Sequence, residues 1–208
     1  TASATSVSWG TSNGNTVALA AQNTAGKSVT VTFTIITYSG GTEVGRNTAS
    51  CLMAIPNTVK PSVAIAVADA AGLLATYGAY VQGKSKLTIT ATPTLAYGSP
   101  IKVYEITADG RTYNTSPVTT DVLQGTGTLE ITAKVTDNRT YPSDVAKTNI
   151  TVLEYAPPAV TVTAYRCNSS GAADPEGAYM KFGFSAAISS LNGKNSATYS
   201  ISYKAGSG

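Results

Sequence analysis

A repeat with a period of about 100 residues constrains this chain more than any other feature of its sequence. The segment PSVAIAV at 61–67 returns as PAVTVTA at 158–164, and the triplet Gly-Ala-Tyr at 78–80 returns at 177–179. One immunoglobulin-like β-sandwich has about this size. The sequence therefore predicts an all-β fold of tandem immunoglobulin-like β-sandwich modules, in which the last module is shortened or truncated.

Proline-containing connections mark the predicted module boundaries. We expect a β-rich N-terminal module at residues 1–56, an immunoglobulin-like β-sandwich at 60–155 and a shortened immunoglobulin-like module at 157–208. The Pro157-Pro158 pair cannot donate hydrogen bonds to a sheet and stiffens the crossing between modules. Trp9, the sole tryptophan, is predicted to fill the core of the first module.

Alternation of apolar and polar residues predicts the individual strands. Residues 28–38 alternate Val, Phe and Ile with Ser and Thr, as expected of a half-buried strand, and a turn at 39–42 leads into a return strand. Residues 66–76 are rich in alanine but interrupted by Gly72, so we expect a loop with one helical turn. Further strands are predicted at 86–91, 101–106, 128–135, 148–155, 180–184 and 196–203, and the strand at 101–106 is expected either to contain a bulge or to be buried on both sides.

Composition argues against two classes of partner. Only 12% of the residues are charged, the formal net charge is +3, and no run of basic residues is interleaved with aromatic ones. Nucleic acids and anionic lipids are bound through concentrated positive charge. The sequence also holds no apolar stretch of the roughly 20 residues that a membrane-spanning helix needs and no signal-peptide pattern. We therefore expect no nucleic-acid partner and no membrane segment.

The sequence predicts a protein without catalytic chemistry. It contains no histidine, which removes every site that depends on an imidazole base or ligand. Two carboxylate pairs remain, Asp174 with Glu176 and Glu105 with Asp109. The first pair offers too few oxygens for calcium, which takes six to eight, and is interpreted as a turn in which Asp174 accepts backbone hydrogen bonds. We expect no catalytic residue, metal or cofactor.

The two cysteines, Cys51 and Cys167, fall in different predicted modules. A disulfide that staples a sandwich needs both partners in one module, so both thiols are predicted to be free, buried and apolar in behaviour. This interpretation fits a chain that folds in a reducing cytoplasm.

Tyrosine supplies the candidate binding residues. The chain has 12 tyrosines, against three phenylalanines and one tryptophan, and tyrosine is common at protein and glycan contacts because it joins an apolar ring to a hydroxyl. Packing inside a sandwich, or a solvated loop position for a basic residue, is the alternative for each candidate. The candidate contacts to a glycan or protein partner are Tyr77, Tyr80, Lys84 and Arg111, with Lys86 and Arg139 as further basic loop residues.

Several long segments resemble minor structural proteins of long-tailed phages that infect Gram-positive bacteria. The resemblance covers the chain from about Ile55 onward and rests on YGAYVQGKSKLTI, YGSPIKVYEITADGRTYN, VTTDVLQGTGTLEITAKVTDNR and YRCNSSGAADPEGAYMKF. The family usually places a glycine-containing turn after its Asp-x-Arg, where this chain has the residues Asp137-Asn138-Arg139-Thr140-Tyr141-Pro142.

The resemblance implies a virion protein of the phage tail or tail tip, assembled in the bacterial cytoplasm. Three hypotheses follow: a non-catalytic spacer of stacked β-sandwiches, a receptor-binding module for host cell-wall polysaccharide, and a bacterial surface adhesin that shares the module type. The expected partners are other tail proteins of the virion and further copies of the same chain in a homo-oligomer, with host cell-wall polysaccharide added under the second hypothesis.

Overall fold

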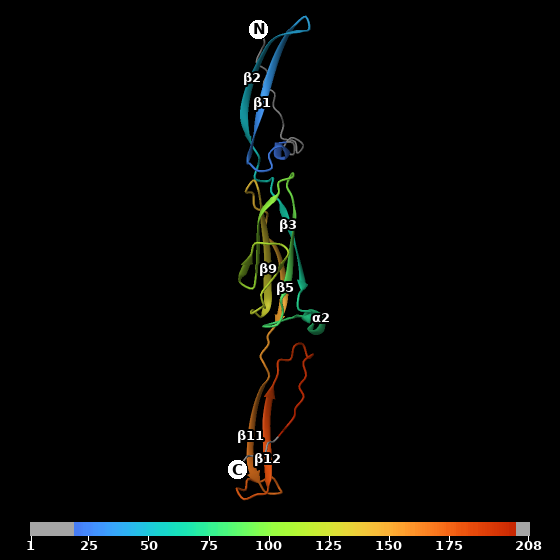
Figure 1. Ribbon diagram of the computed structural model, residues 1–208, viewed down its shortest axis with the longest axis vertical. Coiled ribbons are helices and arrows are strands. Elements are labelled where there is room, and N and C mark those ends of the chain that lie inside the picture. Colours follow the sequence, from blue (N-terminus) through green and yellow to red (C-terminus); the bar gives the residue numbers. More distant parts are fainter. Residues whose placement is uncertain (1–18, 203–208) are drawn as a thin grey trace. The chain divides into compact units, whose positions relative to one another are not determined.

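The computed structural model describes residues 19–202 and confirms the all-β expectation (Figure 1). Trp9 and Tyr203 lie outside the described residues. The elements in chain order are β1 (Ser28–Ser39), β2 (Thr42–Ala54), β3 (Ser62–Asp69), α2 (Leu73–Tyr77), β4 (Tyr80–Val81), β5 (Leu87–Thr94), β6 (Ile101–Ala108), β7 (Arg111–Tyr113), β8 (Val118–Thr119), β9 (Gly127–Asp137), β10 (Ala146–Leu153), β11 (Ala159–Cys167) and β12 (Tyr179–Ala187).

The first two strands form an antiparallel hairpin, as the alternation predicts. Gly40 and Gly41 have φ angles of 56° and 83°, and two successive positive φ angles match a tight hairpin turn to the twist of its strands. The expected half-burial is wrong for the outer part of the hairpin, because Phe33 is 57% exposed and Ile35 66% exposed. The sheet has two strands, and no second sheet of the described residues covers these side chains.

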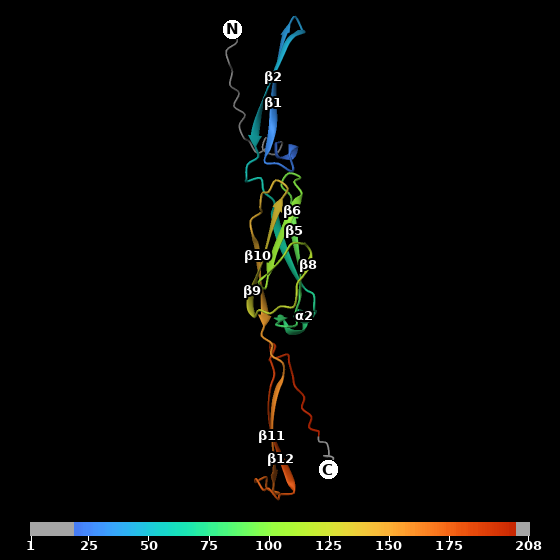
Figure 2. The ribbon, with the colours of Figure 1, turned by 60° about the vertical axis from the view of Figure 1, so that its left-hand side comes forward.

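Two sheets build the central region (Figure 2): β3-β5-β8, and a larger sheet in the order β4-β10-β9-β6-β7. The inward positions follow the predicted period of two, since Ile89 of β5, Ile106 of β6 and Ile131 of β9 are each at most 1% exposed. Of the two alternatives for β6, the register shift between Ile101 and Val103 confirms the bulge. The apolar faces of both sheets therefore form a sandwich core.

The alanine-rich segment contains a single helical turn, as predicted. The Asp69 carboxylate accepts hydrogen bonds from the amides of Ala71 and Leu74, at 2.9 and 2.6 Å, and so fixes the entry into α2. Gly78 ends the helix with a φ of 71°, a left-handed conformation that favours glycine. Within residues 19–202, no helix has the length and apolar character needed to cross a membrane.

The second copy of the repeat forms the antiparallel pair β11–β12. Its Gly177 corresponds to Gly78, but the physical reason for glycine differs: a side chain at 177 would collide with the carbonyl of Cys167. The strand predicted at 196–203 is wrong for its described part, since residues 196–202 form no strand. This segment approaches β12, where the Tyr199 ring lies with its centroid 5.2 Å from that of Phe184.

Contacts between Cα atoms group the chain into two compact units. The first comprises Thr1–Ala68, Thr88–Thr119 and Glu130–Asn149, and the second comprises Asp69–Leu87, Thr120–Leu129 and Ile150–Gly208. The predicted division into three modules stays a prediction.

Both cysteines are free, as expected. Cys167 is buried, but the expectation of burial is wrong for Cys51, which is exposed. The reason lies in the hairpin: Cys51 pairs with Val31 on a strand face that no second sheet covers within residues 19–202.

Two positions on β6 test where the core lies. Ile106 is fully buried and Val103 is 44% exposed. We predict that Ile106→Ala lowers the free energy of unfolding by about 2–5 kcal/mol, because it removes buried methyl groups and leaves a cavity. Val103→Ala should cost no more than about 0.5 kcal/mol. Urea denaturation of both variants measures the difference, and equal losses would contradict the core assignment.

Candidate functional site

The most elaborate polar arrangement in the described chain surrounds Arg139, whose side chain is completely buried. A guanidinium carries five N–H donors in a fixed plane and no acceptor. Each donor position is matched by an oxygen, and four of the five oxygens are backbone carbonyls. Nε donates to Asn23 O (2.9 Å), Nη1 to Ala96 O (2.8 Å) and Asp137 Oδ2 (3.3 Å), and Nη2 to Ala20 O (2.6 Å) and Tyr97 O (3.2 Å).

Asp137 is the counter-charge of this arrangement and is also completely buried. Its second oxygen accepts a hydrogen bond from the Tyr141 amide at 2.9 Å. A buried ion pair adds little net stability by itself, because removing both charges from water is costly. Removing one member of the pair is strongly destabilising, since the other charge then remains buried and unpaired. Arg139 and Asp137 therefore hold the surrounding backbone in one arrangement.

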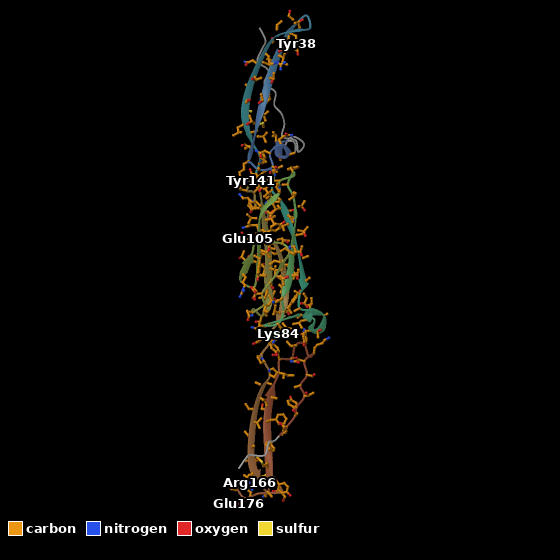
Figure 3. All side chains as sticks on the ribbon, viewed as in Figure 1. Tyr38, Lys84, Glu105, Tyr141, Arg166 and Glu176 are labelled. Carbon is orange, nitrogen blue, oxygen red and sulfur yellow. The ribbon has the colours of Figure 1, made fainter. Side chains whose placement is uncertain are left out.

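Tyr141 extends the same arrangement to the end of β2 (Figure 3). Its hydroxyl donates to Ile55 O at 2.6 Å, and its ring lies under the Lys27 ammonium, 5.0 Å from the ring centroid. The ring also packs in a small apolar cluster with Ala20, Ile55 and Val59. We call Arg139, Asp137, Tyr141 and the carbonyls that they bind the Arg139 clamp. It ties residues 20–27 and 55 to the loops at 96–97 and 137–141.

The turn inside the clamp is strained. Thr140 has a φ of 68°, which is unusual for a β-branched residue. The sequence resemblance places glycine in this turn, and glycine adopts such a φ without steric cost. The Asp137 carbonyl accepts from the Thr140 amide at 2.9 Å, which helps to hold the turn in place.

The structure corrects one interpretation of the sequence. Arg139 was expected in a solvated loop, open to an acidic polymer, but its side chain is 0% exposed. The expectation is wrong because loop position alone does not reveal that four distant carbonyls converge on the guanidinium. The Asp-x-Arg spacing at the end of β9 was the signal that could have identified the clamp.

The candidate contact residues lie in different surroundings. Tyr77 is half-buried at the end of α2, and its carbonyl accepts from Asn192 Nδ2 at 2.8 Å. Lys84 is exposed and lies 5.2 Å from the centroid of the Tyr155 ring (Figure 3). Tyr80 is buried, with 5% exposed, whereas Arg111 is exposed on β7. Tyr77, Tyr80 and Lys84 belong to the second compact unit and Arg111 to the first.

Burial also affects the chemistry of Tyr80. Loss of hydration raises the pKa of its phenol above 10.0, and the negative charge of Asp69 raises it further. A buried, protonated phenol of this kind packs as an apolar ring with one polar tip.

The carboxylate pairs form turns and ion pairs. Asp174 Oδ1 accepts from the Glu176 amide at 3.0 Å, the turn that the sequence predicts. Glu105 pairs with Lys134 at 3.1 Å on the surface of β6 and β9 (Figure 3). No three His, Cys, Asp or Glu side chains gather as metal ligands within residues 19–202.

Comparisons with known proteins give one family and one similar structure. A family model described as "Siphovirus protein of unknown function (DUF859)" matches residues 1–173. A search of curated proteins found no match. A solved structure of Clostridium thermocellum CbhA fibronectin(III)-like modules is 16% identical, covering 62% of this chain and 87% of that chain, with a TM-score of 0.34.

We predict that Arg139→Met lowers the free energy of unfolding by about 3–5 kcal/mol, because it leaves the Asp137 carboxylate and four carbonyls without their donor. The control is Lys147→Met, which removes an exposed ion pair with Glu130 and should cost at most about 1 kcal/mol. The double variant Asp137→Asn/Arg139→Met should lose less free energy of unfolding than the two single variants lose together, because Asp137→Asn removes the charge that Arg139→Met leaves unpaired. Urea denaturation tests all four, and additive losses would contradict the clamp.

The raised pKa of Tyr80 predicts a loss of stability at alkaline pH. Unfolding lets the phenol ionise near pH 10, whereas the folded protein keeps it protonated to higher pH. The stability that the protonated Tyr80 phenol contributes to the folded protein is therefore fully present below pH 10. It is lost as the pH rises through the pKa of the folded state. Tyr80→Phe should weaken this alkaline loss in denaturation curves. Tyr179→Phe, at the exposed counterpart in the repeat, should leave it unchanged, and the same response in both variants would contradict the assignment.

Proposed function

Because this chain belongs to the siphovirus protein family of unknown function DUF859, we propose that it is a non-catalytic structural component of the phage tail, at or near the tail tip. Its β-sandwich modules act there as a spacer between other tail proteins of the virion. The chain is siphovirus-encoded, and we infer that it is assembled into the tail in the bacterial cytoplasm.

The Arg139 clamp is the observation that carries this proposal. A spacer must keep its connections in one geometry under load, and a buried guanidinium with five hydrogen bonds supports a fixed connection. The charged groups of the clamp are inaccessible to a ligand, since Arg139 and Asp137 have no exposed side-chain surface. The buried ion pair and the hydrogen bonds of the Arg139 clamp thus stabilise the fold of the chain itself.

The lack of histidine also supports a structural function, because it removes the commonest catalytic base. The described carboxylates that the sequence suggested for chemistry lie instead in a turn and a surface ion pair. The proposal therefore assigns no residue to catalysis and requires no cofactor.

One observation favours a second candidate function, the binding of host cell-wall polysaccharide. Lys84 is exposed over the Tyr155 ring, and the half-buried Tyr77 belongs to the same compact unit. An exposed ammonium can form charge-assisted hydrogen bonds with the anionic groups of an acidic polymer. The bacterial adhesin hypothesis gains no support, because the matching family is viral.

Phage variants separate the two candidate functions. We predict that phage carrying the triple change Tyr77→Ala, Lys84→Ala and Arg111→Ala assemble tails and adsorb to host cells as the parent phage does. A spacer makes no contact with the host through these side chains. Phage carrying Arg139→Met should yield fewer intact tails in electron micrographs, because the clamp is lost. Lys147→Met serves as the matched control.

Mass spectrometry of purified tails provides the direct measurement, since the spacer proposal requires this chain in the particle. Its absence from purified tails would exclude the proposal. Normal assembly of the triple variant with lost adsorption would replace it with the polysaccharide-binding function.

A further inference from the structure

The hairpin β1–β2 has one apolar and one hydroxyl-bearing face. The strand register places Phe33 beside Ala49 on one side and Thr32 beside Ser50 on the other. Thr32 and Ser50 share a hydrogen bond of 2.8 Å on the hydroxyl side. The apolar face of β1–β2 runs from Val29 and Met53 through Val31, Cys51 and Phe33 to Ile35, which pairs with Asn47.

This apolar face has no cover among residues 19–202. No second sheet of the described chain faces the hairpin, and Phe33 and Ile35 are 57% and 66% exposed. A two-stranded sheet is at best marginally stable in water, and it gains stability from a further strand or a packed layer. A contiguous exposed apolar patch marks a surface at which another segment or molecule binds.

Residues 1–18 join the described chain where the apolar face begins. Residues 19–22 form a helical turn, and the fully buried Ala20 packs there in a cluster with Ile55 and Tyr141. Val29, the first residue of the apolar face, packs against the same cluster. The ten residues from 9 to 19 can span up to about 33 Å. Phe33 lies only about 13 Å along β1 from Val29, so position 9 can reach it.

The sequence of this segment suits an apolar face. Residues 1–18 contain no charged side chain, and Val7 and Trp9 alternate with Ser6 and Ser8. Alternate residues of an extended strand lie on the same side, which gives the segment one apolar and one hydroxyl-bearing side. Trp9 is the only tryptophan of the chain, and tryptophan side chains are highly buried on average.

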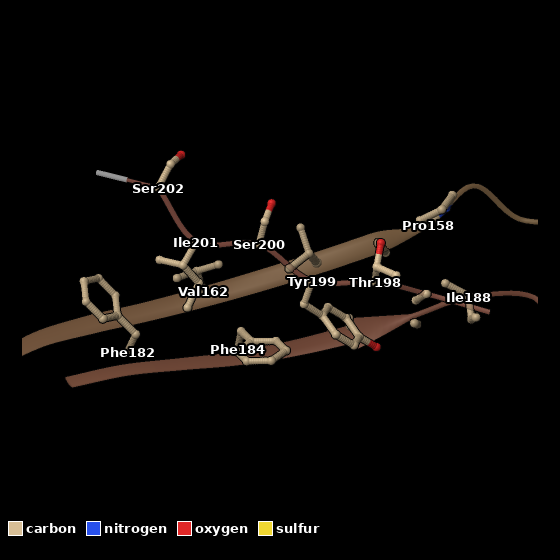
Figure 4. Close-up of a pocket in the computed structure, with 15 residues that line it drawn as sticks. Pro158, Val162, Phe182, Phe184, Ile188, Thr198, Tyr199, Ser200, Ile201 and Ser202 are labelled. Atoms are coloured by element: carbon tan, nitrogen blue, oxygen red, sulfur yellow. The ribbon is translucent and has the colours of Figure 1, made fainter. Parts of the chain in front are cut away.

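The hairpin β11–β12 shows a related arrangement within the described chain (Figure 4). The segment that follows β12 reads Thr-Tyr-Ser-Ile-Ser at 198–202 and also alternates hydroxyl-bearing with apolar residues. The centroid of the Tyr199 ring lies 5.2 Å from that of Phe184. Tyr199 and Ile201 line one groove together with Val162 and Phe184 of the hairpin. A flanking segment with this pattern therefore contacts the apolar face of its own hairpin.

We propose that residues 1–18 cover the apolar face of β1–β2 in the same chain, with the Trp9 ring packed against Phe33 and Cys51. The segment is joined to the cluster from which the face begins, so it acts at a high effective concentration. A separate molecule would lose its translational freedom on binding, whereas a tethered segment loses much less. The tryptophan that the sequence predicts in the core of the first module thus fills the space above this face.

Trp9 reports directly on its surroundings, because the chain has no other tryptophan. In the purified 208-residue chain its emission should lie at shorter wavelength than in the urea-unfolded chain and should resist quenching by acrylamide. Phe33→Thr should shift the emission towards that of the unfolded chain. The matched control is Leu52→Thr, which changes an apolar residue 72% exposed on the opposite face and should leave the emission unchanged. Circular dichroism melting shows whether the central sandwich of each variant is folded.

Cys51 reports on the face itself. It is exposed among the described residues, but we expect it to react slowly with a thiol reagent in the full chain, at every protein concentration. Trp9→Ser should raise the reaction rate of Cys51 by about tenfold or more, because the large apolar ring no longer covers the face. Trp9→Phe should keep most of the protection. Cys167, which is buried in the other compact unit, is the internal reference and should react at the same rate throughout.

A cross-link identifies the chain that supplies the cover. Val7 lies on the same side of an extended segment as Trp9. In a Val7→Cys variant, a short bismaleimide should therefore join position 7 to Cys51 within one chain and give a product of monomer mass. A product of twice that mass would show that the segment covers a second copy, which would overturn the proposal.

Four further results would overturn the proposal. Trp9 emission like that of the unfolded chain, together with a fast-reacting Cys51, would leave the face uncovered. A buried Trp9 with the same emission in the parent and in Phe33→Thr would place the ring on another surface. Protection of Cys51 that persists in Trp9→Ser would assign the cover to other residues. Protection that grows with protein concentration would assign it to a second copy.

Discussion

The hydrogen bonds of the buried Arg139 guanidinium hold together the turns that surround it. Backbone carbonyls in turns have no sheet partner, and burial without one is costly. Arg139 satisfies four such carbonyls, and Ala20 O, the most distant in sequence, lies 119 residues from it. The strained φ of Thr140 persists in the turn beside it because these bonds and the Asp137 carboxylate fix the surrounding backbone. The connection between β2 and the central sheets depends on this arrangement.

The same alternating pattern has two outcomes in this chain. In the central region a second sheet lies opposite, so Ile89 and Ile131 are almost completely buried. In β1–β2 and β11–β12 an equally regular pattern leaves Phe33 and Phe184 more than half exposed. Hairpins with bare apolar faces gain stability from whatever covers those faces. The proposed place in a tail assembly would supply such a cover where the chain's own residues do not.

The candidate site was less predictable than the fold. Tyr80 and Lys84 were equally good contact candidates in the sequence, yet the ring of Tyr80 is buried and Lys84 is exposed over Tyr155. A tyrosine ring suits both a core and a surface, so residue type alone does not decide between them. The Asp-x-Arg motif was visible, but the carbonyls that Arg139 binds come from two stretches of chain distant in sequence, residues 20–23 and 96–97.

By itself, the sequence determined the local structure, because that structure follows from interactions between near neighbours. The period of two defined β5 and β9, paired glycines defined the β1–β2 turn, and the repeat located β11 from β3. Tertiary structure alone decided which faces are covered and where the charges lie. Cys51 is exposed and Arg139 is buried. Burial depends on segments that are distant in sequence, and a strand pattern does not say which segment, or which other molecule, will lie opposite.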